Sequence, residues 1–388
     1  MHWLERWPAL SDDAVIVAAR RTPIATRGRS LARDRVDQLA APVIEATVKD
    51  AELVLGSRIQ VADVLLGNCM GPGGNPARVA ALAAGLGAAV PGGTVDRQCG
   101  SGLAAILDAV TAIRAGDGRP RVAGGAESAS TAPVRSVDGA PYARAVFAPD
   151  GWPDPEMLPA ADQLARVDGI SRDRQEAYAR RSHQRARSAR DADRFVDETV
   201  PLNPKHRGMA TDDAIGGAES LLSRLRPLLP GGTVTAGTAT RISDGAAAVT
   251  LVPARTAVGA HGLVVRSHAV VGCDPALPGI GAAPAVLAAL DDAGVGMAQV
   301  AAFEIVEAFA AQSIAVLSRL GVADDDLRVN ADGGALAFGH PWGASGAVSV
   351  VRLFSRLVRG GAPAGTIGVA AASVGGGMGI AMVVEVVG

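Results

Sequence analysis

The sequence CGSG at residues 99–102 is followed directly by an apolar run at residues 103–114. The sequence WGASG at residues 342–346 is likewise followed by an apolar run, at residues 347–359. Both runs are long enough for a helix, and both are closed by glycine, a residue that commonly ends helices. A Ser-Gly pair therefore stands at the entrance of two predicted helices, and this repetition indicates two related halves.

Strand-like and helix-like segments alternate around these two helices. Residues 61–66 have the pattern of a buried strand and lead to an Ala-rich helix predicted at residues 76–86. A matching strand and helix are predicted at residues 300–305 and 309–320. Alternation of this kind predicts an α/β fold.

The two predicted halves differ in length. We place the N-terminal half at residues 11–256 and the C-terminal half at residues 257–388. The N-terminal half contains a stretch of different character, at about residues 126–229, with Pro-rich turns and an Arg-rich helix at residues 171–190. We predict that this stretch is an inserted loop domain. The Arg-rich helix either presents a solvated face or attracts a phosphate-bearing ligand, and the sequence leaves both interpretations open.

The composition sets limits on the class of protein. The 388 residues are 48% hydrophobic, 20% charged and 3% aromatic, and they include 48 glycines, which suits an α/β protein with closely packed elements. The formal net charge of −2 gives no reason to expect the broad basic surface of a nucleic-acid-binding protein. The first eight residues lack an apolar signal core, and no apolar run is long enough to span a bilayer. We therefore predict a soluble protein without membrane insertion.

The cysteines and histidines show no metal-site or disulfide pattern. The three cysteines lie far apart and form no C-x-x-C pair, so a reducing, cytoplasmic location is predicted. Cys69 and Cys273 stand in apolar, Gly-rich surroundings and are predicted to be small core residues. We predict no metal, because four histidines show no ligand spacing with each other or with cysteine: His183, His206, His261 and His268.

Cys99 is the candidate nucleophile. It stands in a Gly-flanked turn between a strand-like segment and the first of the two helices. Backbone N–H groups at a helix N-terminus favour negative charge, so we expect a stabilised thiolate there. A lone cysteine before a helix is more often a buried structural residue. Further motifs are therefore needed to support a catalytic role.

Two Gly-rich motifs near the C-terminus supply that support. Residues 333–343 present His340 just before the second helix, and a cysteine with a histidine is typical of a nucleophile with its base. In residues 372–379 (ASVGGGMG), glycines can direct backbone N–H groups at an oxyanion. Only nine residues follow Gly379, which excludes a dinucleotide-binding unit. The stretch around Ser345 lacks the G-x-S-x-G spacing of a serine hydrolase.

Together these motifs resemble those of the thiolases, over nearly the whole chain. The resemblance implies five α/β/α/β/α layers built from two βαβαβαββ halves with an inserted loop domain, and dimers or tetramers. It also implies acyl-CoA and coenzyme A as ligands, with no other cofactor. Further segments follow in the order of that family: residues 17–24 (VAARRTPI), 67–68 (GN), 75–78 (NPAR), 124–128 (GGAES), 232–237 (GTVTAG) and 243–247 (SDGAA).

The resemblance also implies roles for individual residues. Cys99 would accept the acyl group as a thioester after His340 activates its thiol. The backbone N–H groups of Cys99 and Gly375 would form an oxyanion hole. Thr240 aligns approximately with a family serine near the pantetheine of coenzyme A. The implied function is acyl transfer, as thiolysis of a 3-ketoacyl-CoA or Claisen condensation of acyl-CoA, through an acyl-Cys99 intermediate.

The sequence departs from the thiolase pattern at important positions. Ser373 replaces the family's proton-shuttling cysteine, and a serine hydroxyl is a much weaker acid. Val306 replaces an asparagine that holds a water in the family's first oxyanion hole; losing one such donor costs roughly 10²–10³ in rate. Acylation should survive both changes, whereas carbon–carbon chemistry should be impaired or reprogrammed. Asp96, often asparagine in the family, should raise the pKa of Cys99.

Three alternatives stay open at this stage. Glu307, next to Val306, is either a base or a structural hydrogen-bonding residue. The chain could instead be an acyl-CoA hydrolase of the same fold, in which water replaces the carbon nucleophile. It could also be a non-catalytic, thiolase-like subunit that binds acyl-CoA.

Overall fold

The computed structural model describes residues 13–142, 144–202, 211–216 and 218–388. His206 and the eight N-terminal residues considered above lie outside these ranges. Among the described residues, no helix has the length and apolar character needed to cross a membrane.

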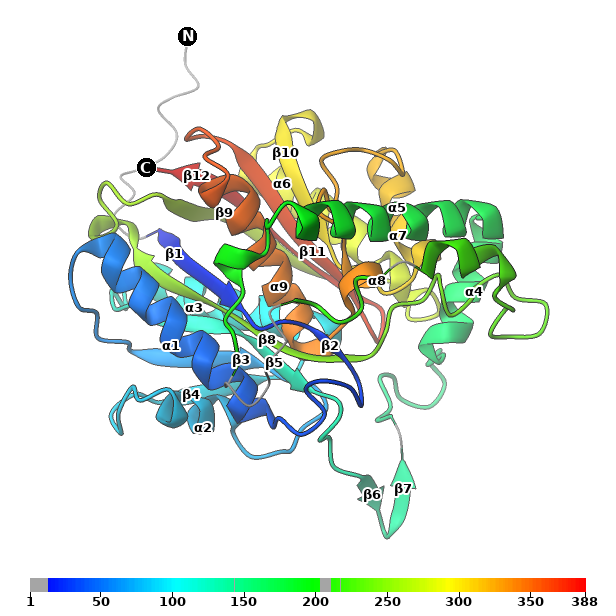
Figure 1. Cartoon of the computed structure of the whole chain (residues 1–388), viewed down its shortest axis with the longest axis horizontal. Helices are drawn as coiled ribbons and strands as arrows, with labels where there is room; N and C mark the ends of the chain where they lie inside the picture. The colour runs from blue at the N-terminus through cyan, green and yellow to red at the C-terminus, as the bar shows by residue number, and fades with distance from the viewer. Residues whose placement is uncertain (1–12, 143, 203–210, 217) are drawn as a thin grey trace.

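One large mixed sheet runs through the molecule, in the order β10-β11-β12-β9-β1-β8-β5-β3-β4, with the short β2 paired to β8 (Figure 1). Most of its strand residues are apolar and buried, as expected for a sheet with helices on both faces. The N-terminal strands are β1 (Ala14–Arg21), β2 (Ala25–Thr26), β3 (Asp63–Gly67), β4 (Gly92–Val95), β5 (Arg121–Ser128) and β8 (Ser243–Pro253). The C-terminal strands are β9 (Gly262–Gly272), β10 (Val300–Ile305), β11 (Ile367–Val374) and β12 (Met378–Val387).

The strand order repeats on the two sides of a seam between β1 and β9. Outward from the seam, β1-β8-β5-β3 is matched by β9-β12-β11-β10. In each set the first two pairings are antiparallel and the last is parallel. The seam itself joins only two residue pairs, Val15 with Val264 and Ile16 with Leu263. The predicted α/β fold of two related halves is confirmed, while the division near residue 256, in the turn between β8 and β9, stays a prediction.

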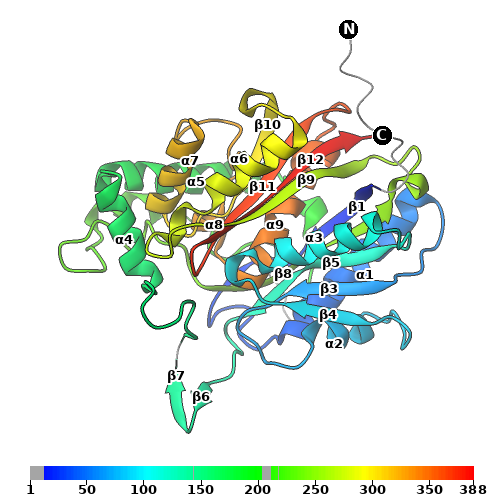
Figure 2. The same cartoon turned by 180° about the vertical axis from the view of Figure 1, so that it is seen from behind.

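The helices complete five layers (Figure 2). On the outer face of the N-terminal half-sheet lie α1 (Val36–Leu55) and α2 (Pro76–Ala83), and on that of the C-terminal half-sheet lie α6 (Ala282–Ala293) and α7 (Ala310–Leu320). Between the two half-sheets lie α3 (Ser101–Arg114) and α9 (Trp342–Phe354), which is followed by a π-helical turn at Ser355–Arg359. Along β12, Ile380 and Met382 face these central helices while Ala381 and Val383 face the outer layer, as strand alternation requires.

The two central helices begin earlier than the sequence predicts, at Ser101 and Trp342. The Gly and Ser residues expected to precede the helices therefore form their first turns. Close packing explains this composition: a Cβ on Gly102 would lie 2.8 Å from the carbonyl oxygen of Gly343, and one on Gly346 would lie 2.8 Å from Leu103 Cβ. Without side chains at these positions, the starts of the two helices can touch.

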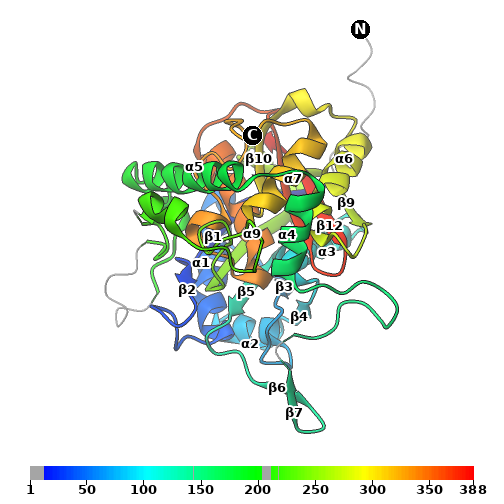
Figure 3. The ribbon, with the colours of Figure 1, turned by 90° about the vertical axis from the view of Figure 1, so that its right-hand side faces the viewer.

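The segment predicted as an inserted loop domain forms two helices and a projecting hairpin (Figure 3). The hairpin consists of β6 (Arg135–Val137) and β7 (Ala140–Tyr142), and the helices are α4 (Met157–Val167) and α5 (Arg172–Asp191). The Arg-rich α5 packs on α7 and on the short α8 (Ala335–Phe338). Arg174 pairs with Asp324, and Arg185 donates to the carbonyl of Val329 at 2.6 Å. These arginines fasten α5 to the C-terminal half, a role that neither sequence interpretation anticipated.

Candidate active site

Cys99 and His340 meet at the facing starts of the two central helices. Cys99 lies in a 3₁₀ turn, Gln98–Gly100, directly before α3, and His340 lies two residues before α9. The Nε2 atom of His340 is 3.1 Å from the Sγ atom of Cys99. The histidine is buried, and the cysteine is half-buried. The geometry therefore brings the predicted nucleophile within hydrogen-bonding distance of the predicted base.

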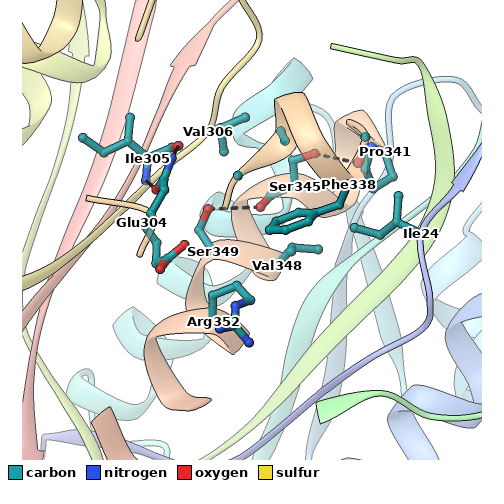
Figure 4. A pocket seen from close by; sticks show the side chains of 14 residues that line it. Ile24, Glu304, Ile305, Val306, Phe338, Pro341, Ser345, Val348, Ser349 and Arg352 are labelled. Carbon is teal, nitrogen blue, oxygen red and sulfur yellow. Dashed lines mark hydrogen bonds between the residues drawn. The ribbon is translucent and has the colours of Figure 1, made fainter. Parts of the chain in front are cut away.

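Ser345 defines which nitrogen of His340 faces the cysteine. The Ser345 hydroxyl lies 2.6 Å from His340 Nδ1. It also lies 3.1 Å from the carbonyl oxygen of Pro341 (Figure 4). A carbonyl can only accept, so the serine proton points to Pro341 and the serine lone pair accepts from Nδ1–H. Nε2 is then unprotonated and directed at Cys99, as a general base requires.

The charge state of this pair differs from the expected thiolate. Burial, together with the smaller effect of the nearby carboxylates of Glu127 and Asp96, raises the pKa of Cys99 to about 12. Burial also lowers the pKa of His340 to about 4. At neutral pH the pair is a thiol and a neutral imidazole. The expectation of a thiolate stabilised by the helix N-terminus was wrong, because desolvation outweighs the backbone hydrogen bond that favours the charge; the expected direction for Asp96 agrees.

The turn that holds Cys99 has a strained backbone, and hydrogen bonds from two side chains stabilise it. Gln98 has a φ of 41°, in the left-handed region that non-glycine residues rarely adopt. Its carbonyl oxygen accepts from Ser101 Oγ at 2.6 Å and from Cys69 Sγ at 3.0 Å. Cys69 thus supports the nucleophile's turn. It and Cys273 are half-buried, so the prediction that both are core residues was wrong.

Gly375 and Thr240 lie in the segments that the sequence indicated. Gly375 follows β11, and a Cβ there would lie 2.8 Å from the ring of Phe147, which comes from the segment predicted to be an insertion. The Thr240 hydroxyl donates to the carbonyl oxygen of Ala335 at 2.6 Å. Their roles in an oxyanion hole and in pantetheine binding stay predictions.

Ser373 is held by the protein framework. Its hydroxyl donates to the carbonyl oxygen of Gly279 at 2.7 Å and accepts from the backbone N–H of Ala282 at 3.0 Å, at the start of α6. The side chain of Gln312 approaches the same oxygen at 3.4 Å. The serine proton is therefore already used by a carbonyl, which the sequence motif did not reveal.

A small cavity of about 20 Å³ lies beside Pro341 and Ser345 (Figure 4). Val306 lines it together with Ser345, Ser349 and Arg352. This volume suits about one water molecule. Arg352 Nε, which is buried, has no hydrogen-bond partner among the described residues. The valine side chain offers no polar atom to such a water.

Glu307 is a structural residue in this fold. It is fully buried, and its carboxylate accepts from Tyr178 Oη (3.1 Å), Asn330 Nδ2 (2.8 Å), Ser182 Oγ (2.8 Å) and the backbone N–H of Leu336 (3.2 Å). These partners come from α5 in the inserted segment and from the C-terminal half. The hydrogen-bonding interpretation of Glu307 therefore fits better than that of a base.

Glu127 is a residue near the site to which the sequence assigned no role. It ends the motif GGAE of β5, is fully buried, and contributes to the electrostatic environment of Cys99. A buried carboxylate in an apolar strand is the signal that could have indicated it. Of the histidines considered as metal ligands, His183, His261 and His268 lie in described segments. No group of three metal-binding side chains occurs there or elsewhere in the described chain.

Comparison with known proteins agrees with this architecture. Residues 14–255 match the family model "Thiolase, N-terminal domain" and residues 261–386 match "Thiolase, C-terminal domain". A Pseudomonas aeruginosa protein named acetyl-CoA acetyltransferase is 40% identical over 395 residues, covering 95% of this chain and 98% of the relative. The crystal structure of the Bacillus anthracis acetyl-CoA acetyltransferase superposes with a TM-score of 0.87 at 32% identity, covering 97% of this chain and 99% of that one. This chain belongs to the thiolase family.

Proposed function

We propose that the chain transfers acyl groups from acyl-CoA through an acyl-Cys99 intermediate. Membership of the thiolase family makes it a thiolase-type acyltransferase. The observation that carries the finer proposal is the 3.1 Å contact between Cys99 Sγ and the unprotonated Nε2 of His340. Relatives named acetyl-CoA acetyltransferase support an acetyl group as one substrate.

The acylation step follows from the two pKa values. Because Cys99 is a thiol at neutral pH, His340 Nε2 takes its proton as the sulfur attacks the thioester carbonyl carbon. The backbone N–H groups of Cys99 and Gly375 would donate to the resulting oxyanion. The carbon–sulfur bond to coenzyme A then breaks, and the leaving thiolate takes the proton from His340. Acyl-Cys99 and free coenzyme A result, without another cofactor.

The second half-reaction is the one we expect to be altered. Carbon–carbon bond formation needs a group that removes a proton from the α-carbon of the second acyl-CoA, and cleavage needs its return. Ser373 donates its proton to Gly279, and Val306 has no polar atom to hold a water. We propose that acylation is retained and that condensation or thiolysis is slow or takes a different acceptor. The same changes favour hydrolysis of the acyl-enzyme as the second candidate function.

A homo-oligomer in the cytoplasm fits the molecule best. Within the described part of the chain, the edge strand β4 has a neighbour on one side only, and the hairpin β6–β7 pairs only with itself. An isolated hairpin is marginally stable in water, and an open edge favours pairing with another chain. All three cysteines are free, which supports a reducing compartment.

The test is the intact mass of the protein after incubation with acetyl-CoA and longer acyl-CoAs, in wild type and in Cys99→Ala, while free coenzyme A and 3-ketoacyl-CoA are followed. We expect an acyl adduct that is absent from Cys99→Ala. A condensed product identifies a transferase, and free coenzyme A alone identifies a hydrolase. A folded protein that forms no adduct with any acyl-CoA would contradict the proposal and favour a binding subunit.

A further inference from the structure

The carboxylate of Glu127 receives four hydrogen bonds at the base of the site. Its Oε1 atom accepts from Asn68 Nδ2 at 3.0 Å and from the backbone N–H of Met70 at 3.1 Å. Its Oε2 atom accepts from the backbone N–H groups of Cys69 at 3.1 Å and Gly343 at 2.9 Å. The three backbone N–H groups can only donate, and the Asn68 amide is held as a donor because its Nδ2 also donates to the carbonyl of Ala126 while its Oδ1 accepts from the N–H of Gly71.

These donors come from both halves of the molecule. Residues 68–70 follow β3 and include Cys69, which binds the carbonyl of Gln98 beneath the nucleophile. Gly343 lies in the first turn of α9, three residues after His340. A Cβ on Gly343 would lie 2.7 Å from Asn68 Cα, so the backbones already touch where the carboxylate joins them. Glu127 therefore ties the segment that carries the base to the segment that supports the nucleophile.

The negative charge of the Glu127 carboxylate also acts on Cys99. The charged groups that act on Cys99 are Glu127 and Asp96, and both oppose the thiolate; Cys69 and His340 are the other titratable neighbours of this site. Among the described residues, no arginine or lysine forms an ion pair with Glu127. Its charge is balanced only by N–H dipoles.

We propose that Glu127 is a positioning residue, which fixes His340 against Cys99 and whose charge adds to burial in keeping the nucleophile a thiol until His340 removes the proton. The proposal rests on the acylation of Cys99 proposed above. The gain for the protein is selectivity, because a thiol reacts slowly with oxidants and alkylating agents. An acyl-CoA bound beside His340 is then the preferred electrophile.

Glu127→Gln tests both parts of the proposal. Whichever way the amide is turned, its NH₂ group faces two N–H donors, so the link between Gly343 and residues 68–70 weakens while the charge is lost. We expect acetylation of Cys99 by acetyl-CoA to slow by at least about tenfold. We expect alkylation of Cys99 by iodoacetamide at pH 8 to become about threefold faster or more, because the thiolate gains stability. Peptide mass mapping separates Cys99 from Cys69 and Cys273.

Glu307→Gln is the matched control. Glu307 is also fully buried and also accepts two bonds on each oxygen, but one partner on each oxygen is a hydroxyl that can turn to accept. We expect both rates to stay within about twofold of wild type. A general effect of losing a buried glutamate would instead change both variants in the same way.

Opposite changes in the two rates support the proposal when the pH profile of alkylation also moves to lower pH. Loosening of the site alone exposes Cys99 and raises the alkylation rate by the same factor at every pH, and that result would overturn the charge part of the proposal. Unchanged acetylation, unchanged alkylation or a parallel fall in both rates in Glu127→Gln would overturn it. If that variant does not fold, Glu127→Asp replaces it, because aspartate keeps the negative charge on a side chain that is one methylene shorter. We expect this variant to show slower acetylation with unchanged alkylation. Unchanged acetylation would overturn the proposal. Alkylation of Cys99 reports on Glu127 even if wild type forms no acyl adduct, which would count against the proposed function alone.

Discussion

Helices α3 and α9 occupy equivalent places in the two halves, yet their entrances carry different chemistry. At the start of α3, Ser101 Oγ bonds to the backbone of its own turn, accepting from the N–H of Arg97 at 2.7 Å and donating to Gln98 at 2.6 Å. At the start of α9, the corresponding Ser345 reaches the ring of His340 at 2.6 Å. One serine shapes the turn of the proposed nucleophile, and the other orients the proposed base.

This difference shows how a repeated fold builds one site. Each half supplies a helix start at the centre of the molecule, where glycines allow close contact. Neither entrance could activate a thioester alone, since one lacks a base and the other lacks a nucleophile. The chemistry depends on the residue that precedes each helix, and the distance between the two residues depends on packing of the halves.

The largest effect is expected from removing the base. His340→Gln should slow acylation of Cys99 by about 10²–10⁴, the range of general acid–base catalysis. The measurement is the rate of adduct formation by intact mass. His268→Gln, which changes a half-buried histidine on β9, should stay within about twofold of wild type. A modest loss in His340→Gln would show that Cys99 needs no base from the second half.

The next effect concerns the contact between the halves. A Cβ on Gly125 would lie 2.8 Å from Ala344 Cα in the first turn of α9. Gly125→Ala should therefore lower the free energy of unfolding by about 2–3 kcal/mol, because backbone cannot move aside as a side chain can. Chemical denaturation measures this loss. Gly272→Ala, where the nearest atom is 4.0 Å away, is the control, and equal stability of the two variants would contradict the close approach.

A smaller effect is expected from the two serines at the helix starts, and it should differ between Ser345 and Ser101. Ser345→Ala removes the partner of His340 Nδ1 and should slow acylation by about three- to tenfold, the worth of one hydrogen bond. Ser101→Ala should mainly lower thermal stability, because its partners are backbone groups of the turn. Adduct formation and thermal unfolding, measured on both variants, test this division. The comparison fails if Ser345→Ala acylates at the wild-type rate.

The smallest effect is the response to pH. His340, with a pKa of about 4, is neutral above pH 6, and Cys99, with a pKa of about 12, stays a thiol below pH 9. The acylation rate should be nearly flat between pH 6 and pH 9 and fall only as pH approaches 4, where His340 is protonated. An inflection near pH 7 would indicate an ion pair. The unfolded histidine binds protons more readily, so stability should also rise with pH between about 4 and 6.5.

Local sequence patterns were sufficient to predict most of the helices and strands. The helix expected at residues 76–86 exists but ends at Ala83, because Gly85, with a φ of 75°, closes it early. The strand and helix expected at residues 300–305 and 309–320 are β10 and α7. Such elements depend on spacing within a few residues, which a sequence displays directly.

The sequence by itself determined the two helix entrances and the residues at them, because turn glycines and apolar periods are local. Only the tertiary structure decided that Cys99 is a half-buried thiol, that Ser373 donates to Gly279, and that Glu127 joins the halves. The bond from Gly343 to Glu127 spans 216 positions of the chain, and the contact of His340 with Cys99 spans 241. Burial and hydrogen-bond partners arise from such distant segments, so pKa values and proton directions follow from packing.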